Sequence, residues 1–448
     1  MPARDEDYHA MKTGTVTIIG AGPAGLAAAA SAAPYARVML LDENPEPGGQ
    51  IWRASAGEAA TAAAALWEQA RQAGAQWLGG RRVVAADAQS LLVEDAAGAE
   101  RLPWEKLVLA PGAREIFLPF PGWTLPGVLG AGGLQALVKN GLDIHRQRVM
   151  VAGSGPLLPA VAAFLRSQGA KIIGIAEQAT RMQLAGLAWA SLRSPEKRRQ
   201  AAELFRQLHG VPYLTHCWVE AAEADEAKHK PSGWLTSVRL RRGRQRWREE
   251  CDWLACGFGL APNVELARLF GCELVPAEKN QPPTIAADDF QLTSQPNIWC
   301  AGEITGIGGL ELSLLEGRIA GLAAAGQTEQ ARHWRKARER QRAFARALAR
   351  AGRINPELRR LSSDETIVCR CEDVPLGRLR GYHSWREARL QERCGMGACQ
   401  GRVCSVITGW LWNWQFDTPR PPVSPARTET LALLAADTNK ETTTELIL

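Results

Sequence analysis

The chain of 448 residues lacks a Cys-x-x-Cys motif, although it contains ten cysteines. Dithiol–disulfide exchange between closely spaced cysteines is therefore not expected. None of the seven histidines lies in a glycine-rich turn, and no Ser/His/Asp set or motif-like carboxylate pair is present. We therefore predict no catalytic acid–base or nucleophilic residue on this chain.

The chain also lacks a strong compositional bias. Hydrophobic residues make up 46% and charged residues 22%, which is ordinary for a globular protein of two or three domains. The net charge of +6 is small, and no compact Lys/Arg patch is interleaved with aromatics. This pattern gives no indication of a nucleic-acid partner.

Long apolar runs are scarce. The one uncharged stretch that could suggest a signal peptide or spanning helix covers residues 13–36, but it is interrupted by Gly20, Gly22, Pro23, Gly25 and Pro34. Its β-branched residues come first and its alanines second, which predicts a strand, a turn and a helix. We therefore expect a cytoplasmic chain without an integral membrane segment.

A first βαβ unit is predicted near the N-terminus. A strand at 16–19 leads into the turn 20–25, an Ala-rich helix follows, and a second strand at 38–41 ends at Asp42. This is the context in which Gly-x-Gly-x-x-Gly binds a dinucleotide. Gly20 permits the tight turn, and Gly22 allows the backbone to approach a pyrophosphate. Asp42 is then positioned to accept hydrogen bonds from a ribose.

A second unit begins with the strand at 149–152 and ends near Glu177, so the chain carries two dinucleotide-type domains. Gly153 and Gly155 are present, but Leu158 occupies the third glycine position, where helix and strand should touch. Glu177 could hold a ribose hydroxyl and would disfavour a 2′-phosphate. NAD, another nucleotide such as ATP, and no ligand remain open for this site.

Residues from about 328 to 360 predict a basic helical connector. Its arginines alternate with Phe344, Leu348 and alanines. We expect a solvated helical face, with docking on a partner as the alternative.

The residues after Asp42 resemble the flavoproteins related to glutathione reductase and thioredoxin reductase. The resemblance rests on the Pro-Gly-Gly-Gln run 47–50, on Ala110-Pro111-Gly112, on 257–263 and on Ala301-Gly302-Glu303. Asp is usual in that superfamily where Glu303 stands here. The resemblance implies FAD held by Gly20, Gly22, Pro23, Ala24, Gly25, Asp42, Glu43, Gly49, Gln50, Arg53, Ala110, Gly112, Gly302 and Glu303.

The cysteines fall into two groups. Five are scattered, and we interpret them as buried, inert thiols: Cys217, Cys251, Cys256, Cys272 and Cys300. The other five lie between Cys369 and Cys404. Four thiolates are what a [2Fe–2S] cluster requires, whereas Cys-x-Cys is an unusual spacing for zinc. Zinc and a metal-free module are the alternatives, and the spacing does not decide which four thiols bind.

The stretch from Val368 resembles the bacterioferritin-associated-ferredoxin-like [2Fe–2S] domain. In the matching variant of that domain, Cys-x-Cys-Glu is followed later in the sequence by Gly-Met-Gly-x-Cys-Gln-Gly-x-x-Cys. This resemblance implies the ligands Cys369, Cys371, Cys399 and Cys404. Cys394 is then a near neighbour and the alternative ligand.

Taken over residues 14–415, the chain resembles the larger FAD subunits of heteromeric opine oxidase, hydroxyproline dehydrogenase and hydrogen cyanide synthase. That family implies an FAD-dependent oxidoreductase subunit that transfers electrons, while an amino-acid-oxidase-like FAD subunit oxidises an opine, D-hydroxyproline or similar secondary amine. A small ferredoxin-like subunit, an FMN at the subunit interface and a peripheral link to a quinone-reducing chain are further candidates.

The expected fold is α/β, with two glutathione-reductase-like dinucleotide domains and a small helical [2Fe–2S] domain. The expected divisions are 1–120 with 285–327 (FAD), 121–284 (second dinucleotide domain), 328–364 (connector), 365–415 (cluster) and 416–448 (tail). Two other functions remain open. One is a stand-alone NADH-dependent flavin and iron–sulfur reductase, and the other is a scaffold whose redox centres are silent.

Overall fold

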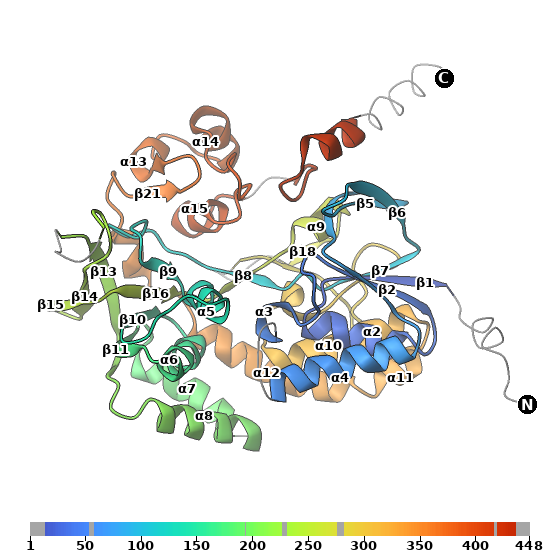
Figure 1. Cartoon of the computed structure of the whole chain (residues 1–448), viewed down its shortest axis with the longest axis horizontal. Helices are drawn as coiled ribbons and strands as arrows, with labels where there is room; N and C mark the ends of the chain where they lie inside the picture. The colour runs from blue at the N-terminus through green and yellow to red at the C-terminus, as the bar shows by residue number, and fades with distance from the viewer. Residues whose placement is uncertain are drawn as a thin grey trace, which may run out of the picture.

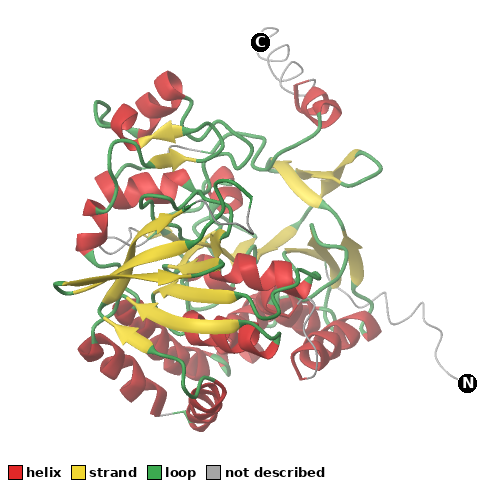
Figure 2. Cartoon of the chain, turned by 60° about the vertical axis from the view of Figure 1, so that its left-hand side comes forward, coloured by secondary structure: helices red, strands yellow, loops and turns green. Residues whose placement is uncertain are grey.

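Two parallel five-stranded sheets organise the chain (Figure 1). The computed structural model describes residues 14–52, 58–192, 194–225, 231–275, 282–415 and 419–435. Figure 2 shows the strands of both sheets with helices packed around them. The architecture is mixed α/β, as the two βαβ patterns predict.

The first sheet has the order β20-β7-β1-β2-β3. Its central strand β1 pairs in parallel with β2 and β7, and β20 joins the edge from almost 200 residues further along the chain. The strands are β1 (Thr15–Ile19), β2 (Arg37–Asp42), β3 (Gln76–Gly79), β7 (Lys106–Leu109) and β20 (Ile298–Cys300). Its helices are α2 (Pro23–Ala32), α3 (Gly49–Trp52), α4 (Glu58–Gln72) and α10 (Leu310–Ala324).

Helices α2 and α10 pack backbone to backbone. A Cβ atom at Gly317 would lie 2.1 Å from the carbonyl oxygen of Ala24, and one at Gly321 would lie 2.3 Å from that of Ala28. Glycine is therefore required at both positions of α10. This contact fixes the glycine-rich turn before α2 against the segment that contains Glu303.

The second sheet has the order β12-β11-β10-β16-β9. Its strands are β9 (Val128–Gly130), β10 (Arg148–Gly153), β11 (Lys171–Glu177), β12 (Tyr213–Thr215) and β16 (Trp253–Gly257). The helices beside it are α5 (Ala131–Lys139), α6 (Leu157–Ser167), α7 (Arg181–Leu192) and α8 (Pro195–Gln207).

The first sheet with its helices is called the first unit, and the second sheet with its helices the second unit. Smaller elements complete and connect these two units. Two antiparallel sheets contain β4 (Arg82–Ala86), β5 (Ser90–Glu94) and β6 (Ala99–Pro103), and β13 (Cys217–Glu223), β14 (Ser237–Arg242) and β15 (Gln245–Glu250). Strands β8 (Ala113–Glu115) and β17 (Leu260–Pro262) pair between the units. The others are α9 (Glu265–Leu269), β18 (Leu274–Val275), β19 (Thr284–Ile285) and η1 (Gly302–Thr305).

The connector forms α11 (Thr328–Arg332), α12 (Arg335–Ala351) and η2 (Pro356–Arg360). The interpretation of α12 as a solvated face is wrong for Arg338, whose side chain is 0% exposed. Arg338 donates to the backbone carbonyl of Asp289 at 2.7 Å and to Oε1 of Gln291 at 3.1 Å. These acceptors compensate the cost of burying a guanidinium.

The cysteine module contains β21 (Ile367–Cys369), β22 (Val374–Pro375), α13 (Leu376–Leu379), α14 (Trp385–Glu392) and α15 (Cys404–Trp412). It shares one hydrophobic core with the second unit, and the indole of Trp123 donates to the carbonyl of Ile367 at 2.7 Å. Val423, later in the chain, contacts the first unit, where its amide donates to the carbonyl of Val84 at 2.7 Å.

Across the residues that the structure describes, no helix combines the length and hydrophobicity needed to cross a bilayer.

Candidate functional site

The first glycine-rich turn has the close contacts that its sequence requires. Gly20 has φ +101°, and a Cβ there would lie 2.2 Å from the carbonyl oxygen of Ala110. A Cβ at Gly25 would lie 1.7 Å from the carbonyl oxygen of Gly20. The turn thus packs tightly on its own helix and on the end of β7, as in dinucleotide sites.

Gly49, from the Pro-Gly-Gly-Gln run, lies directly against this turn. A Cβ at Gly49 would come within 2.7 Å of the Cα atom of Gly22. Asp42, at the end of β2, accepts from the amide of Ala21 at 2.6 Å and from the amide of Asn44 at 2.8 Å. The glycine-rich turn, the end of β2 and the Pro-Gly-Gly-Gln run therefore meet at one place, and the contacting residues Ala21 and Asp42 are 21 positions apart.

These motifs open into a cavity of about 1770 Å³ between the two units. Single-ligand pockets are typically about 300–1,000 Å³, so the cavity has room for more than one group. The predicted FAD residues that line it are Gly20, Gly22, Pro23, Asp42, Glu43, Gly49, Gln50, Ala110, Gly112 and Glu303. Ala24, Gly25 and Gly302 are buried behind it. Arg53 lies outside the described residues.

Two acids of the first unit lie beside this cavity in different surroundings. Burial raises the pKa of Glu303 from 4.5 to about 7. Burial also raises the pKa of Glu316, which accepts from Thr305 Oγ1 at 2.6 Å and pairs with Arg342 at 3.2 Å. Our sequence reasoning missed Glu316 and Arg342, because α10 and α12 carry no motif that marks them.

The second turn is only partly open to the cavity. Gly155 lines it, and nothing lies within 4 Å of a Cβ added there. Gly153 packs instead on β16, where its Cβ would lie 1.9 Å from the carbonyl oxygen of Gly257. Leu158 is fully buried.

Glu177 is not among the residues that line the cavity. It is fully buried and accepts from the amide of Gly155 at 2.8 Å and the amide of Ala179 at 2.9 Å. Burial raises its pKa. These bonds match those of Asp42, which accepts from the amides of Ala21 and Asn44, and a contact between Glu177 and a ribose stays a prediction.

Arg114 connects the cavity to the cysteine module. Its side chain lines the cavity, and Nε donates to the carbonyl oxygen of Arg402 at 2.9 Å. The same guanidinium donates to Asn263 Oδ1 at 2.8 Å and pairs with Glu265 at 2.8 Å. Because Arg402 lies between Cys399 and Cys404, one side chain bridges the flavin-type motifs and the cysteine loop.

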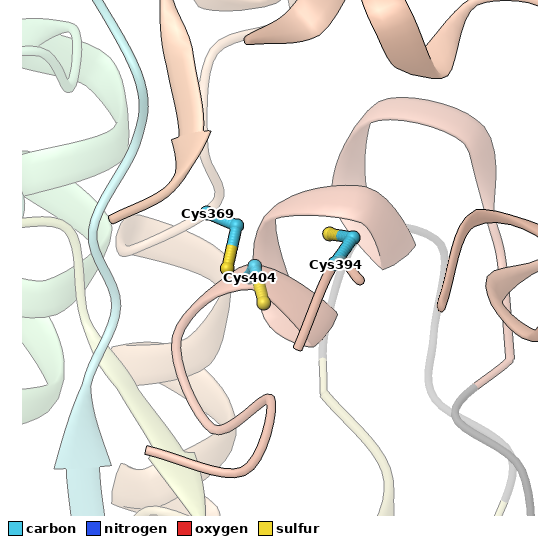
Figure 3. A group of neighbouring side chains, drawn as sticks. All are labelled: Cys369, Cys394 and Cys404. Carbon is cyan, nitrogen blue, oxygen red and sulfur yellow. The ribbon is translucent and has the colours of Figure 1, made fainter. Parts of the chain in front are cut away.

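Three thiols of the cysteine module converge below the surface (Figure 3). The sulfur atoms of Cys369, Cys394 and Cys404 all lie within 4.8 Å of one another, and all three residues are buried. The amide of Gly395 also donates to the sulfur of Cys369 at 3.4 Å. The structure thus gathers two of the predicted ligands, Cys369 and Cys404, with the alternative ligand Cys394.

The other two predicted ligands lie at the edge of this group. Cys371 is exposed and Cys399 is half-buried. Their side chains are hydrogen-bonded, and Cys371 also interacts electrostatically with Cys369. All five cysteines of the sequence cluster therefore lie together. The five scattered cysteines are buried, in agreement with the interpretation of inert thiols.

The electrostatics of the triad suit a bound cation. Hydrogen bonds from Cys394 and Cys404 lower the pKa of Cys369 to about 2. The bond to Cys369 raises the pKa of Cys394 to about 12 and also raises that of Cys404. One thiolate is therefore shared by two thiols, and further deprotonation requires a positive charge among the sulfurs. Metal binding meets that requirement, since it takes cysteines as thiolates.

Comparison with known proteins places the chain among flavin-dependent oxidoreductases. The family described as pyridine nucleotide-disulphide oxidoreductase matches residues 14–339. Hydrogen cyanide synthase subunit HcnB of Pseudomonas aeruginosa is 32% identical, over 91% of this chain and 96% of the relative. The A subunit of opine oxidase from Agrobacterium tumefaciens is 31% identical, over 87% and 83% respectively.

A solved structure agrees with this fold. L-proline dehydrogenase from P. horikoshii aligns with a TM-score of 0.66 at 18% identity, covering 93% of this chain and 79% of the other. The cysteine module lies after the region that the family match covers. The chain belongs to the pyridine nucleotide-disulphide oxidoreductase family, and it is an oxidoreductase related to HcnB and to the A subunit of opine oxidase.

Proposed function

We propose that this chain is the electron-transfer subunit of a heteromeric dehydrogenase, with FAD in the large cavity and a [2Fe–2S] centre in the cysteine module. The observation that carries the proposal is the Arg114 bridge, because it joins the cavity wall to the loop between Cys399 and Cys404. A chain that only bound a nucleotide would not need this connection to a thiol cluster.

The residues of the cavity fit FAD. The open backbone at Gly22 and the amides that begin α2 would receive the pyrophosphate, and Asp42 would hold the ribose. Glu303 lines the same cavity and has a raised pKa, so it can keep a proton near neutral pH. The chemistry supplied by the bound groups would be the acceptance of electron pairs by flavin and one-electron transfer by the iron–sulfur centre.

For the metal centre we propose the ligands Cys369, Cys371, Cys399 and Cys404, with Cys394 as a buried neighbour. Cys369 and Cys404 belong to the observed triad. Cys399 and Cys371 lie side by side at its edge. The proposed domains are those expected from the sequence, with FAD bound by 1–120 and 285–327, the second dinucleotide domain at 121–284, the connector at 328–364, the cluster domain at 365–415 and the tail at 416–448.

The substrate would be oxidised on another chain. HcnB and its opine oxidase counterpart are both named as subunits, which supports the existence of partner chains. We propose an amino-acid-oxidase-like partner that oxidises an opine, D-hydroxyproline or a similar secondary amine. In support, no motif-like catalytic set occurs in this sequence.

The second turn is proposed to hold a nucleotide, such as NAD or ATP, without passing hydride to the flavin. Gly155 offers open space, but the bulk of Leu158, at the third glycine position, departs from a competent NADH site. Mixing NADH with the purified chain tests this. Rapid bleaching of the flavin would instead support a stand-alone reductase.

The main test is anaerobic purification of the chain with and without its co-expressed oxidase-like partner. We expect flavin, two irons and two acid-labile sulfides in the chain alone, with oxidation of the secondary amine only in the complex. Turnover of the amine by the isolated chain would contradict the division of labour. Unchanged activity of a complex that carries Cys399→Ser would support a silent scaffold.

A further inference from the structure

A second hollow, which we call the arginine groove, lies beside the cysteine loop. It has a volume of about 560 Å³, and four arginines line it: Arg386 and Arg389 from α14, Arg402 from the loop between Cys399 and Cys404, and Arg420 from the segment after the module. Its walls therefore come from separate parts of the chain that the fold brings together.

The charge of the arginine groove is not neutralised within the described residues. Glu265 is the carboxylate that lines it, and this side chain pairs with Arg114 at 2.8 Å. The guanidinium of Arg402 donates to the backbone carbonyls of Cys399 and Val423 and to Ser424 Oγ. None of the four arginines has a carboxylate within ion-pair distance among the described residues. Such a groove favours an anionic occupant.

The groove also contains apolar surface and adjoins the outer edge of the thiol cluster. Leu390, on the exposed side of α14, lines it and is 66% exposed. Gln400, which also lines it, follows Cys399 directly in the sequence, and Cys399 contacts the exposed Cys371. The lining thus combines arginines with the apolar residues Leu390, Pro421, Pro422 and Val423, a combination that is typical of a protein interface and less suited to a small ion.

We propose that the arginine groove docks a small acidic electron-carrier protein, which receives electrons at the Cys371–Cys399 edge. This inference rests on the proposed function, because it requires a redox-active metal centre in the cysteine module. The transfer oxidises the reduced centre by one electron and reduces the carrier by one electron, with no bond made or broken. Carboxylates on the carrier would pair with the arginines and steer the encounter.

Charge reversal in the groove tests the proposal. The variant R386E/R389E changes two guanidiniums of α14, whereas R198E/R199E makes the same charge change on the exposed surface of α8. In Figure 1, α14 and α8 lie at opposite ends of the molecule. R420E is an additional groove variant that leaves both helices intact. Iron content and circular dichroism verify that each variant is folded and loaded.

Binding is measured by titration calorimetry with three probes: an acidic [2Fe–2S] ferredoxin, a basic c-type cytochrome and phosphatidylglycerol vesicles. We expect the wild-type chain to bind the ferredoxin, with an affinity that falls about tenfold or more as salt is raised to physiological strength. The two groove variants should lose at least about tenfold in affinity, while R198E/R199E should bind like wild type.

Equal binding of ferredoxin by the groove variants and the wild type would overturn the proposal, and so would failure of the wild type to bind ferredoxin at low salt. Preference of the wild type for the basic cytochrome, or binding of the vesicles alone, would overturn it as well. These results are distinguishable from failure of the proposed function, which would appear as absence of iron and sulfide from the wild-type chain.

Discussion

Arg114 and Glu115 are consecutive residues of β8 whose side chains connect to different domains. The guanidinium of Arg114 bonds to the carbonyl of Arg402 in the cysteine loop at 2.9 Å. The carboxylate of Glu115 accepts from the amides of Gly132 and Gly133, at the start of α5, at 2.7 and 2.9 Å. Neighbouring residues of a strand face opposite sides, so this short strand links the cysteine module and the second unit to the wall of one cavity.

The Arg114 bridge makes a first prediction. Arg114→Ala leaves Glu265 without its ion-pair partner and removes a donor from the Arg402 carbonyl, which should lower the free energy of unfolding by about 1–3 kcal/mol. It should also slow reduction of the metal centre after flavin reduction, by about tenfold, as followed by stopped-flow absorbance.

A matched control separates stability from electron transfer. Arg148, at the start of β10, pairs with Asp252 at 3.2 Å and with Glu250 at 2.6 Å, and neither partner belongs to the cysteine module. Arg148→Ala should destabilise the protein by a comparable amount without slowing the reduction of the metal centre. Equal rates of metal-centre reduction in the two variants would show that Arg114 does not contribute to electron transfer.

The flavin site makes a second prediction. Gly22→Val places a branched side chain where the pyrophosphate would approach the turn, so the purified protein should contain little flavin while retaining its circular dichroism. Gly98→Ala is the control, because nothing lies within 4 Å of a Cβ added at Gly98. Flavin bound by the valine variant at wild-type stoichiometry would show that the cofactor lies elsewhere.

The cysteine module makes a third prediction. Cys369→Ser, Cys371→Ser, Cys399→Ser and Cys404→Ser should each lose most of the iron and sulfide, whereas Cys394→Ser should retain them. The reason is that the proposed ligand set leaves Cys394 as a neighbour of the centre, although its sulfur lies within 4.8 Å of those of Cys369 and Cys404. Metal analysis and the visible spectrum measure the result. Loss of iron in Cys394→Ser with retention in Cys371→Ser would make the observed triad the ligand set.

Glu303 makes a fourth prediction, for the flavin-free protein. Its pKa is raised from 4.5 to about 7, so the folded state binds the proton more tightly than the unfolded state does. The contribution of Glu303 to stability is therefore present below pH 4.5 and is lost as the pH rises to about 7. The Tm of wild type minus that of Glu303→Gln should fall across this window and be constant above it. A difference that is flat or rises with pH would show that Glu303 is not buried in this way.

The parts of the fold that depend on local backbone geometry were predictable. The turn Gly20–Gly25, the strand that ends at Asp42 and the second unit from Val149 to Glu177 each combine glycine spacing with a change of hydrophobic period. Cys369 and Cys404 were predictable for a different reason, since clustered cysteines in one short segment indicate a metal or redox site.

The connections between domains were not predictable from the sequence. Arg114, Glu115 and Glu316 belong to no motif, and their partners lie from 11 to 288 residues away. Arg338 was misjudged because an arginine on an amphipathic helix is usually solvated, and its burial depends on acceptors from the distant segment 289–291. Such contacts arise only when separate elements pack.

Anaerobic reductive titration of the purified chain tests the central claim most directly. A flavin and a [2Fe–2S] centre in contact should take up about three electrons per chain, and both the flavin absorbance and the iron–sulfur absorbance should be bleached at equilibrium. A chain that takes up only two electrons, with no absorbance beyond that of flavin, would contradict the presence of a redox centre in the cysteine module.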